Sequence, residues 1–184
     1  SPAEGYAQIA LALACRDYGK QATVFVAKRA LRHERTAKAI AAGAKVVEVE
    51  PGYLTTVQAR AREYAGAQGA VVLPFGLDCE AIIAALSDVA AGLNVEPPQV
   101  WCASGSGTLS RALQRAWPKA EHFAVQVGRT PNVGRARLIK APETFSQNAK
   151  SPPPFPSCSN YDAKVWRFFR ERAAPGALFW NVGA

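Results

Sequence analysis

The sequence predicts an α/β fold in which a parallel sheet carries helices on both faces. Short apolar runs rich in β-branched residues alternate along the chain with longer segments whose apolar residues recur at helical spacing. Such alternation is typical of parallel strands joined by crossover helices. Sites in these sheets lie beyond the carboxyl ends of the strands, so the loops after the strands are the first candidates for a functional site.

The expected elements follow one another regularly up to residue 127. The expected strands are 22–27, 45–49, 70–73, 99–103, 123–127 and 177–182. The expected helices are 5–18, 30–42, 54–67, 79–93, 108–117 and a last one that starts near Tyr161. Asp78 is a candidate N-cap for the helix that follows it.

The stretch from 128 to 159 breaks this regularity. It contains scattered basic residues and then SPPPFPS at 151–157, which favours an irregular, Pro-rich arm.

Composition indicates a packed chain with an excess of basic charge. Of the 184 residues 49% are hydrophobic, and 22 Lys and Arg against 14 Asp and Glu give a net charge of +8. This charge fits anionic ligands or nucleic acid without choosing between them. No apolar run approaches the roughly 20 residues that cross a bilayer, and no leader-like segment opens the chain. We therefore expect a cytoplasmic protein with no membrane partner.

The cysteines and histidines do not predict a metal site. The four cysteines are widely spaced without a CxxC pair, so we expect reduced thiols rather than zinc ligands or disulfides. His33 and His122 are the only histidines, and both are predicted to lie at the surface.

The best candidate site is the loop Ser104-Gly105-Ser106-Gly107-Thr108. It follows the β-rich run at 99–103 and precedes an amphipathic helix. Small residues allow backbone N–H groups to approach a phosphate closely, and the N-terminus of the next helix adds partial positive charge. The three hydroxyl side chains supply further donors. The sequence therefore predicts a phosphate-binding loop.

Two common phosphate loops do not match this one. A Walker loop requires Gly-Lys followed by Ser or Thr, and no lysine lies within 104–108. A dinucleotide fingerprint requires a third glycine and an acidic residue after the next strand. GSGTLS lacks that glycine, and Gln126-Val127-Gly128 supplies no acid.

The order of motifs resembles the fold-type-II pyridoxal-phosphate enzymes, the tryptophan-synthase-β-like group that includes threonine dehydratases, cysteine synthases and aminocyclopropane-carboxylate deaminase-like proteins. SPAEGYA at 1–7 is similar to that family's Ser-x-Gly-Asn-x-Gly loop. The stretches 19–50 and VVLPFG at 71–76 resemble its next strands and helix, and ASGSGTLSRAL at 103–113 resembles its phosphate loop. YDAKVWRFF and GALFWNVGA resemble its last helix and strand.

The resemblance implies pyridoxal 5'-phosphate as cofactor and a small amino acid as substrate, in a lyase or deaminase reaction. The cofactor-binding residues implied are Ser104, Gly105, Ser106, Gly107, Thr108 and Asn181. The substrate-binding residues implied are Ser1, Glu4, Gly5 and Tyr6. It also implies a smaller αβ lobe at 1–93, a portion of the larger lobe at 94–184 that includes the arm 128–159, and a homodimer.

The family's Schiff-base lysine lies upstream of its Ser-x-Gly-Asn loop, so the resemblance implies a fold that is incomplete at the N-terminus. Two interpretations stay open. The chain is either the later part of an enzyme or a member of a lineage that kept the fold without the chemistry. Glu4 stands where the family has Asn, and a carboxylate there would repel a substrate carboxylate.

Two functions of other classes compete with the enzyme. The first is a non-catalytic protein that binds a phosphorylated metabolite or a partner through the same loop. The second is nucleic-acid binding by a basic stripe of Arg29, Arg32, Arg35 and Lys38. Because the interleaved aromatic residues of single-strand binders are missing, a solvated helix face is the preferred interpretation of this stripe. Tyr161 is predicted to pack in the core, in phase with Val165 and Phe168.

Overall fold

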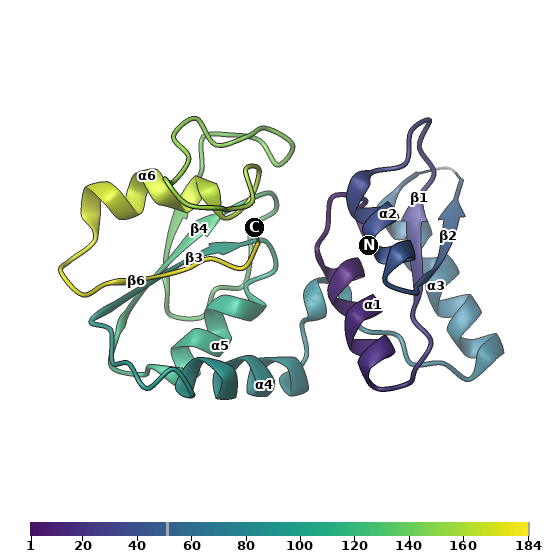
Figure 1. Ribbon diagram of the computed structural model, residues 1–184, viewed down its shortest axis with the longest axis horizontal. Helices are drawn as coiled ribbons and strands as arrows, with labels where there is room; N and C mark the ends of the chain where they lie inside the picture. Colours follow the sequence, from purple (N-terminus) through teal and green to yellow (C-terminus); the bar gives the residue numbers. More distant parts are fainter. Residues whose placement is uncertain (51, 184) are drawn as a thin grey trace. The chain divides into compact units, whose positions relative to one another are not determined.

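The structure, a computed structural model, describes residues 1–50 and 52–183. It divides into two compact units, Ser1–Phe75 and Gly76–Ala184 (Figure 1). The chain passes from one unit to the next within a short 3-10 turn, η1 (Phe75–Leu77). Each unit has its own sheet and its own hydrophobic core.

The first unit is a two-stranded parallel sheet with helices on both faces. Strands β1 (Thr23–Ala27) and β2 (Lys45–Val49) pair with Val24 opposite Val46. Helices α1 (Ala7–Asp17) and α2 (Glu34–Ala41) cover the face that carries Val24 and Val26. Helix α3 (Leu54–Gln68) covers the opposite face, where Phe25 packs with Val57. Alternate residues of β1 thus point to opposite helical layers, as the period of two requires.

The second unit holds a four-stranded parallel sheet in the order β5-β4-β3-β6. Its strands are β3 (Gln99–Ser104), β4 (Glu121–Gln126), β5 (Arg137–Lys140) and β6 (Leu178–Trp180). Helix α6 (Ala163–Arg172) lies on one face, and α4 (Glu80–Ala91) and α5 (Thr108–Ala116) lie on the other (Figure 1). Strand β3 lies between two neighbours, so the loop that follows it leaves from the interior of the sheet.

The core of the second unit is built on β3. Trp101 is fully buried on the α6 side and stacks on Phe123 with 4.1 Å between the ring centroids. On the other side, Val100 and Cys102 pack with Leu113 of α5. This packing fixes β3 against helices on both faces and so fixes the start of the loop that follows it.

The predicted α/β class, with parallel strands and helices on both faces, is confirmed. The two units meet earlier in the sequence than the predicted boundary after residue 93, because α4 packs on α5. Ala90 lies in the same buried cluster as Leu113, and Glu80 forms an ion pair with Arg115. Asp78 does not cap α4 and instead pairs with Arg111 of α5.

Three local predictions are wrong. Residues 70–73 form no strand, and Val71 is 87% exposed, because no strand of the described chain lies beside them to complete a ladder. The irregular arm contains a four-residue strand, β5, whose sequence RLIK shows no alternation of apolar and polar residues. His122 is buried at 5% exposure in β4, where its Nε2 lies 2.9 Å from the Trp117 carbonyl oxygen.

Among the described residues, no helix combines the length and apolar character that crossing a bilayer requires.

Candidate functional site

The loop 104–108 joins the end of β3 directly to α5. Gly107 precedes the first residue of α5 with a left-handed φ of +95°. A Cβ on Gly107 would lie 1.8 Å from the Asn132 carbonyl oxygen, so no other residue fits without moving the backbone. The glycine therefore allows the chain to turn from strand to helix within three residues while residues 132–133 lie against it.

The loop offers unpaired backbone donors. In the described ranges, the N–H groups of Ser106 and Gly107 meet no protein acceptor, whereas the Ser106 carbonyl accepts from Asn132 N at 3.1 Å. Both amides lie immediately before the first turn of α5, where the helix dipole adds partial positive charge. A helix N-terminus with open amides is suited to an anion, above all a phosphate.

The two outer hydroxyls of the loop converge on one carbonyl. Thr108 Oγ1 and Ser106 Oγ lie 3.0 and 3.3 Å from the Gly76 carbonyl oxygen, and 2.9 Å from each other. Each hydroxyl has a single proton and rotates freely. The same protons can therefore turn from Gly76 to a ligand in the loop.

Gly76 lies unusually close to the loop. A Cβ there would be 2.4 Å from the Cβ of Ser106, and its φ of +72° is left-handed. Sequence reasoning missed this contact, since 32 positions separate Gly76 from Thr108. The only available signal was the glycine itself in VVLPFG.

The inner side of the loop meets Tyr161. The Tyr161 ring packs against the core as predicted, but a Cβ on Gly105 would lie 2.7 Å from its hydroxyl. Burial raises the pKa of Tyr161 far above its ordinary value, and the Asp162 carboxylate adds to the rise. Nearby, Ser104 Oγ is buried and has no hydrogen-bond partner among the described residues.

Asn181 uses its amide to hold the Pro-rich arm. Its Oδ1 accepts from Ser157 Oγ at 2.7 Å, and its Nδ2 donates to the Pro156 carbonyl at 2.8 Å. Gly183 extends this link, because its N–H donates to Asp162 and its carbonyl accepts from Cys158. The end of β6 and the start of α6 are thereby tied together. Cofactor binding by Asn181 stays a prediction, and it requires one of these bonds to open.

A model of the pyridoxal-phosphate dependent enzyme family matches residues 4–172. The chain belongs to this family. The match includes the loop 104–108 and both units, and it confirms the resemblance noted in the sequence. A comparison with curated protein sequences found no match.

Solved structures of the family share the fold at low sequence identity. Diaminopropionate ammonia lyase from Escherichia coli superposes with a TM-score of 0.62 and 16% identity, over 90% of this chain and 55% of that one. O-acetyl serine sulfhydrylase isoform 3 from Entamoeba histolytica gives 0.56 and 15%, over 78% and 52%. Threonine deaminase isoform 2 from Solanum lycopersicum gives 0.54 and 16%, over 69% and 36%. The chain thus spans between about a third and somewhat over half of the solved relatives.

Pyridoxal phosphate is the cofactor of this family, and the loop 104–108 fits its phosphate. The loop has several donors that can bind an anion. They are the unpaired amides of Ser106 and Gly107, the rotatable hydroxyls of Ser106 and Thr108, and the buried Ser104 hydroxyl, which has no partner among the described residues. Glycine at 105 and 107 lets Tyr161 and the Asn132 carbonyl pack directly against the loop backbone. This set suits a phosphate ester.

The predicted substrate loop lies in the first unit, before α1. Glu4 forms an ion pair with Arg29 at 2.6 Å, and the guanidinium of Arg35 donates to the Glu4 carbonyl. Arg35 also lies over the Tyr6 ring, 4.0 Å from its centroid. Arg29 therefore pairs with the Glu4 carboxylate and Arg35 with its backbone carbonyl, and the two positive charges offset the repulsion of a substrate carboxylate that Glu4 would otherwise exert. A Cβ on Gly5 would lie 2.8 Å from Ser1 Oγ, so the loop is tight at that point.

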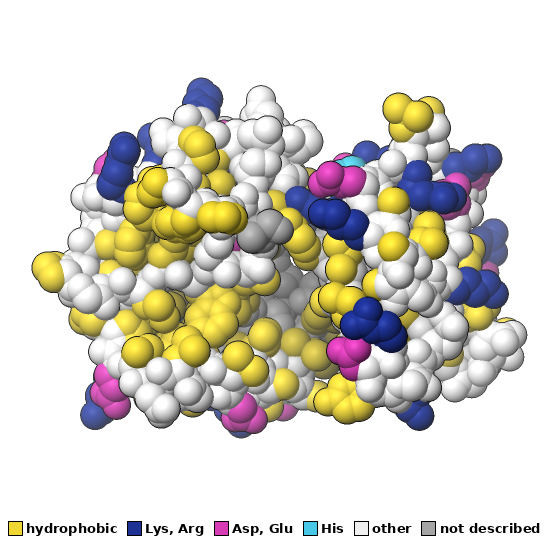
Figure 2. All heavy atoms as spheres, in the orientation of Figure 1, with side chains coloured by type: hydrophobic (Ala, Val, Ile, Leu, Met, Phe, Trp, Pro, Cys, Tyr) yellow, Lys and Arg dark blue, Asp and Glu magenta, His cyan; other side chains and the backbone are white. Residues whose placement is uncertain are grey.

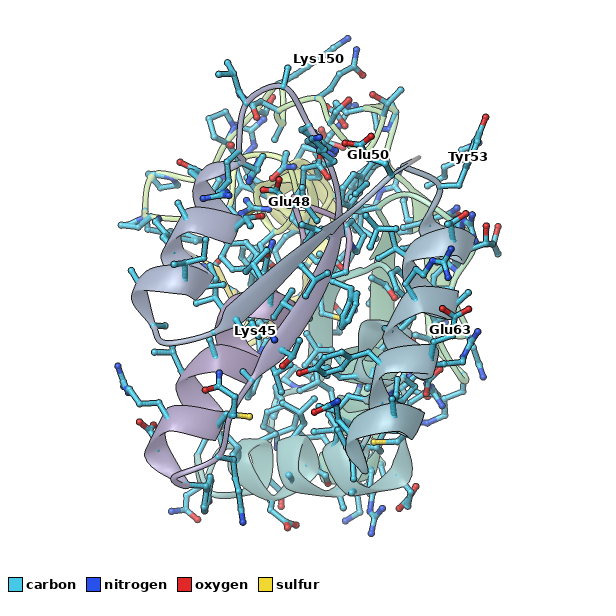
Figure 3. All side chains as sticks on the ribbon, turned by 90° about the vertical axis from the view of Figure 1, so that its right-hand side faces the viewer. Lys45, Glu48, Glu50, Tyr53, Glu63 and Lys150 are labelled. Atoms are coloured by element: carbon cyan, nitrogen blue, oxygen red, sulfur yellow. The ribbon has the colours of Figure 1, made fainter. Side chains whose placement is uncertain are left out.

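The basic residues at 29–38 do not form an open stripe. Helix α2 begins at Glu34, so Arg29 and Arg32 precede it rather than share its face. Arg32 pairs with Glu48 at 2.9 Å, near the end of β2 opposite to Lys45 (Figure 3). On the face of this unit in Figure 2, Lys and Arg side chains lie beside Asp and Glu. These pairs leave little unpaired charge for a nucleic acid.

The remaining reactive groups are buried or scattered. Burial raises the pKa of the Cys102 thiol to about 12, and the Asp162 carboxylate adds to the rise. Lys164 is 1% exposed and donates to the Thr144 carbonyl at 2.8 Å, and burial lowers its pKa. Among the described residues, no three His, Cys, Asp or Glu side chains gather as metal ligands.

Proposed function

We propose that this chain binds the phosphate of pyridoxal phosphate in the loop 104–108, as part of a lyase or deaminase that acts on a small amino acid. The observation that carries the proposal is the pair of open amides at Ser106 and Gly107, at the carboxyl end of an interior strand of the sheet. Family membership supplies the cofactor. The names of the structural neighbours, an ammonia lyase and a deaminase, support the reaction class.

The loop holds the phosphate by two kinds of donor. The Ser106 and Gly107 amides donate along the axis of α5, whose dipole favours the dianion. The hydroxyls of Ser106 and Thr108 turn from the Gly76 carbonyl toward the phosphate oxygens. Hydrogen bonds to a charged acceptor are about twice as strong as neutral ones, so this exchange is favourable.

When bound, the cofactor withdraws electrons from the α-carbon of the amino acid. The loop 1–6 is proposed to bind the carboxylate of the amino acid. Arg29 and Arg35 make the surroundings of Glu4 net positive, and this charge would attract the carboxylate. Ser1 and Tyr6 frame the same loop, and Tyr6 is held in place by Arg35.

A second candidate is a non-catalytic protein that binds a phosphorylated metabolite. The observation that favours it is Glu4. Its carboxylate stands where the family has Asn and is occupied by Arg29. In this function the same loop binds the phosphate, and no covalent attachment of the ligand occurs.

Calorimetric titration of the full chain with pyridoxal phosphate and with pyridoxal tests the phosphate site. We expect binding that depends on the phosphate and that weakens at least ten-fold in the double variant Ser106→Ala, Thr108→Val, because two hydroxyl donors are lost. Ser159→Ala, an exposed serine in the same unit, is the matched control. Equal affinity for the two compounds would contradict the proposal.

Borohydride reduction followed by mass spectrometry separates the two candidates. A covalent adduct after reduction, in the protein expressed from its complete gene, indicates the enzyme. Phosphate-dependent binding without an adduct in that protein indicates the non-catalytic binder.

A further inference from the structure

Tyr161, in the segment before α6, places its hydroxyl beside Gly105, the first residue after β3. The contact is close enough that a Cβ on Gly105 would lie 2.7 Å from the hydroxyl and 3.5 Å from the ring edge. Glycine at 105 is therefore required by the tyrosine as well as by the turn.

The position of the ring is fixed by the backbone around it. Tyr161 N donates to the Cys158 carbonyl at 3.0 Å, and the Tyr161 carbonyl accepts from Lys164 N at 3.1 Å at the start of α6. The ring packs against the cluster that contains Trp101 and Val165. These two backbone hydrogen bonds and the packing of the ring hold the Tyr161 hydroxyl in one position. A binding group needs such a fixed position, which a mobile surface tyrosine lacks.

The hydroxyl of Tyr161 has a proton to donate. Among residues 1–50 and 52–183, no hydrogen bond from this proton to a protein acceptor is found. Burial raises the pKa of the hydroxyl, so the proton remains bound at neutral pH. The loop therefore has an O–H donor beside Gly105 in addition to its own hydroxyls.

We propose that Tyr161 is a ligand-binding residue that donates its hydroxyl proton to the phosphate held by the loop 104–108. This inference rests on the proposed function of that loop. It adds a donor from the segment before α6 to the amides of Ser106 and Gly107. The site is then assembled from two segments that are more than 50 positions apart in the sequence, and the Pro-rich arm that precedes Tyr161 contributes by holding this segment in place.

The test compares Tyr161→Phe with the unchanged chain by calorimetry, with pyridoxal phosphate, inorganic phosphate and pyridoxal as ligands. We expect the affinity for the two phosphates to fall about ten-fold or more, and the affinity for pyridoxal to stay the same, because only a donor to the phosphate is lost. Tyr53→Phe is the matched control, since Tyr53 is 75% exposed and points away from the molecule in Figure 3.

A second measurement does not depend on the stability of the variant. In protein labelled with fluorotyrosine, addition of inorganic phosphate is expected to shift one fluorine resonance, the one that Tyr161→Phe removes. The resonance of Tyr53 is expected to stay in place. If Tyr161→Phe fails to fold, the signals are assigned instead by removing the other four tyrosines, and a shift of Tyr161 supports the proposal.

The outcomes separate this inference from the proposed function. Binding of pyridoxal phosphate by the unchanged chain with equal or tighter binding by Tyr161→Phe overturns the role of Tyr161 and leaves the loop as the site. An equal loss for pyridoxal also overturns it, since the ring would then act through packing. Failure of the unchanged chain to bind either phosphate overturns both.

Discussion

The two loops that lead into helices α1 and α5 are opposite in the hydrogen-bonding groups that they leave open. In the loop 1–6, donors meet the carbonyls: Arg35 binds the Glu4 carbonyl, and Gln8 Nε2 binds those of Ala3 and Gly5 at 2.7 and 3.0 Å. In the loop 104–108, the carbonyl of Ser106 is paired while its amide and that of Gly107 are open. The carbonyl acceptors of the first loop are therefore satisfied by side chains of its own unit, whereas the second loop has amide donors without a protein acceptor among the described residues.

The difference shows why similar composition does not imply similar chemistry. Both loops are rich in small residues and precede a helix. In the first loop, Arg35 binds the Glu4 carbonyl and Arg29 pairs with the Glu4 carboxylate, so positively charged side chains hold this loop in place. In the second loop, the Ser106 and Gly107 amides meet no acceptor among the described residues, so they are available to a ligand.

The largest effect on stability is expected from Gly107→Ala, a substitution in the second loop. The left-handed φ and the 1.8 Å approach of the Cβ to the Asn132 carbonyl predict a loss of about 3 kcal/mol or more in the free energy of unfolding. Gly43→Ala is the control, because Gly43 has the same φ of +95° with nothing near its Cβ. It should cost only about 1–2 kcal/mol. Equal losses in denaturant titrations would show that the contact with Asn132 is unimportant.

A smaller effect on stability is expected from Arg35→Ala, which removes a side chain that supports the first loop. Arg35 is 8% exposed, and the variant lacks its contact with the Tyr6 ring and its bond to the Glu4 carbonyl. We expect a loss of about 2 kcal/mol and faster amide exchange in residues 1–8. Arg60→Ala, which removes an exposed pair with Glu63, should cost at most about 0.5 kcal/mol. Unchanged exchange in the loop would argue against its dependence on Arg35.

A pH effect is expected from His122, which lies at the start of β4, at the end of the sheet away from the second loop. Burial lowers its pKa, and the Arg135 guanidinium lowers it further. Because the unfolded chain then binds the proton more tightly, the stabilisation is complete above the ordinary pKa of 6.5 and is lost as pH falls below it. One histidine changes stability by at most about 1.4 kcal/mol per pH unit. His122→Gln should flatten this dependence in thermal unfolding, and an identical slope would contradict the assignment.

The smallest effect on the fold concerns the thiols. The pKa of Cys102 is raised to about 12, so it stays protonated and unreactive at pH 8, whereas the half-exposed Cys15 and Cys79 should react with a thiol reagent. Mass spectrometry of the labelled native chain should find Cys102 unmodified until denaturant is added. Labelling of Cys102 as fast as Cys15 would mean that β3 opens readily.

The sequence by itself determined the class of fold, the central strand and the turn at 104–108 that joins this strand to a helix. Strong local signals carry these features: an apolar run at 99–103, glycines at 105 and 107, and helical periodicity after Thr108. These signals are local in the sequence. A strand buried between two helical layers must be apolar throughout, so its position can be recognised from the sequence alone. The same reasoning failed at 70–73, where a β-rich run has no neighbouring strand within the described chain.

Only the tertiary structure decided what surrounds that loop. It places the Gly76 carbonyl near the Ser106 and Thr108 hydroxyls, the Tyr161 hydroxyl beside Gly105 and the Asn181 amide on the Pro-rich arm. These partners come from far along the chain, and no periodicity links them. A hydrogen bond depends on distances of tenths of an ångström, which arise from the packing of whole helices and strands.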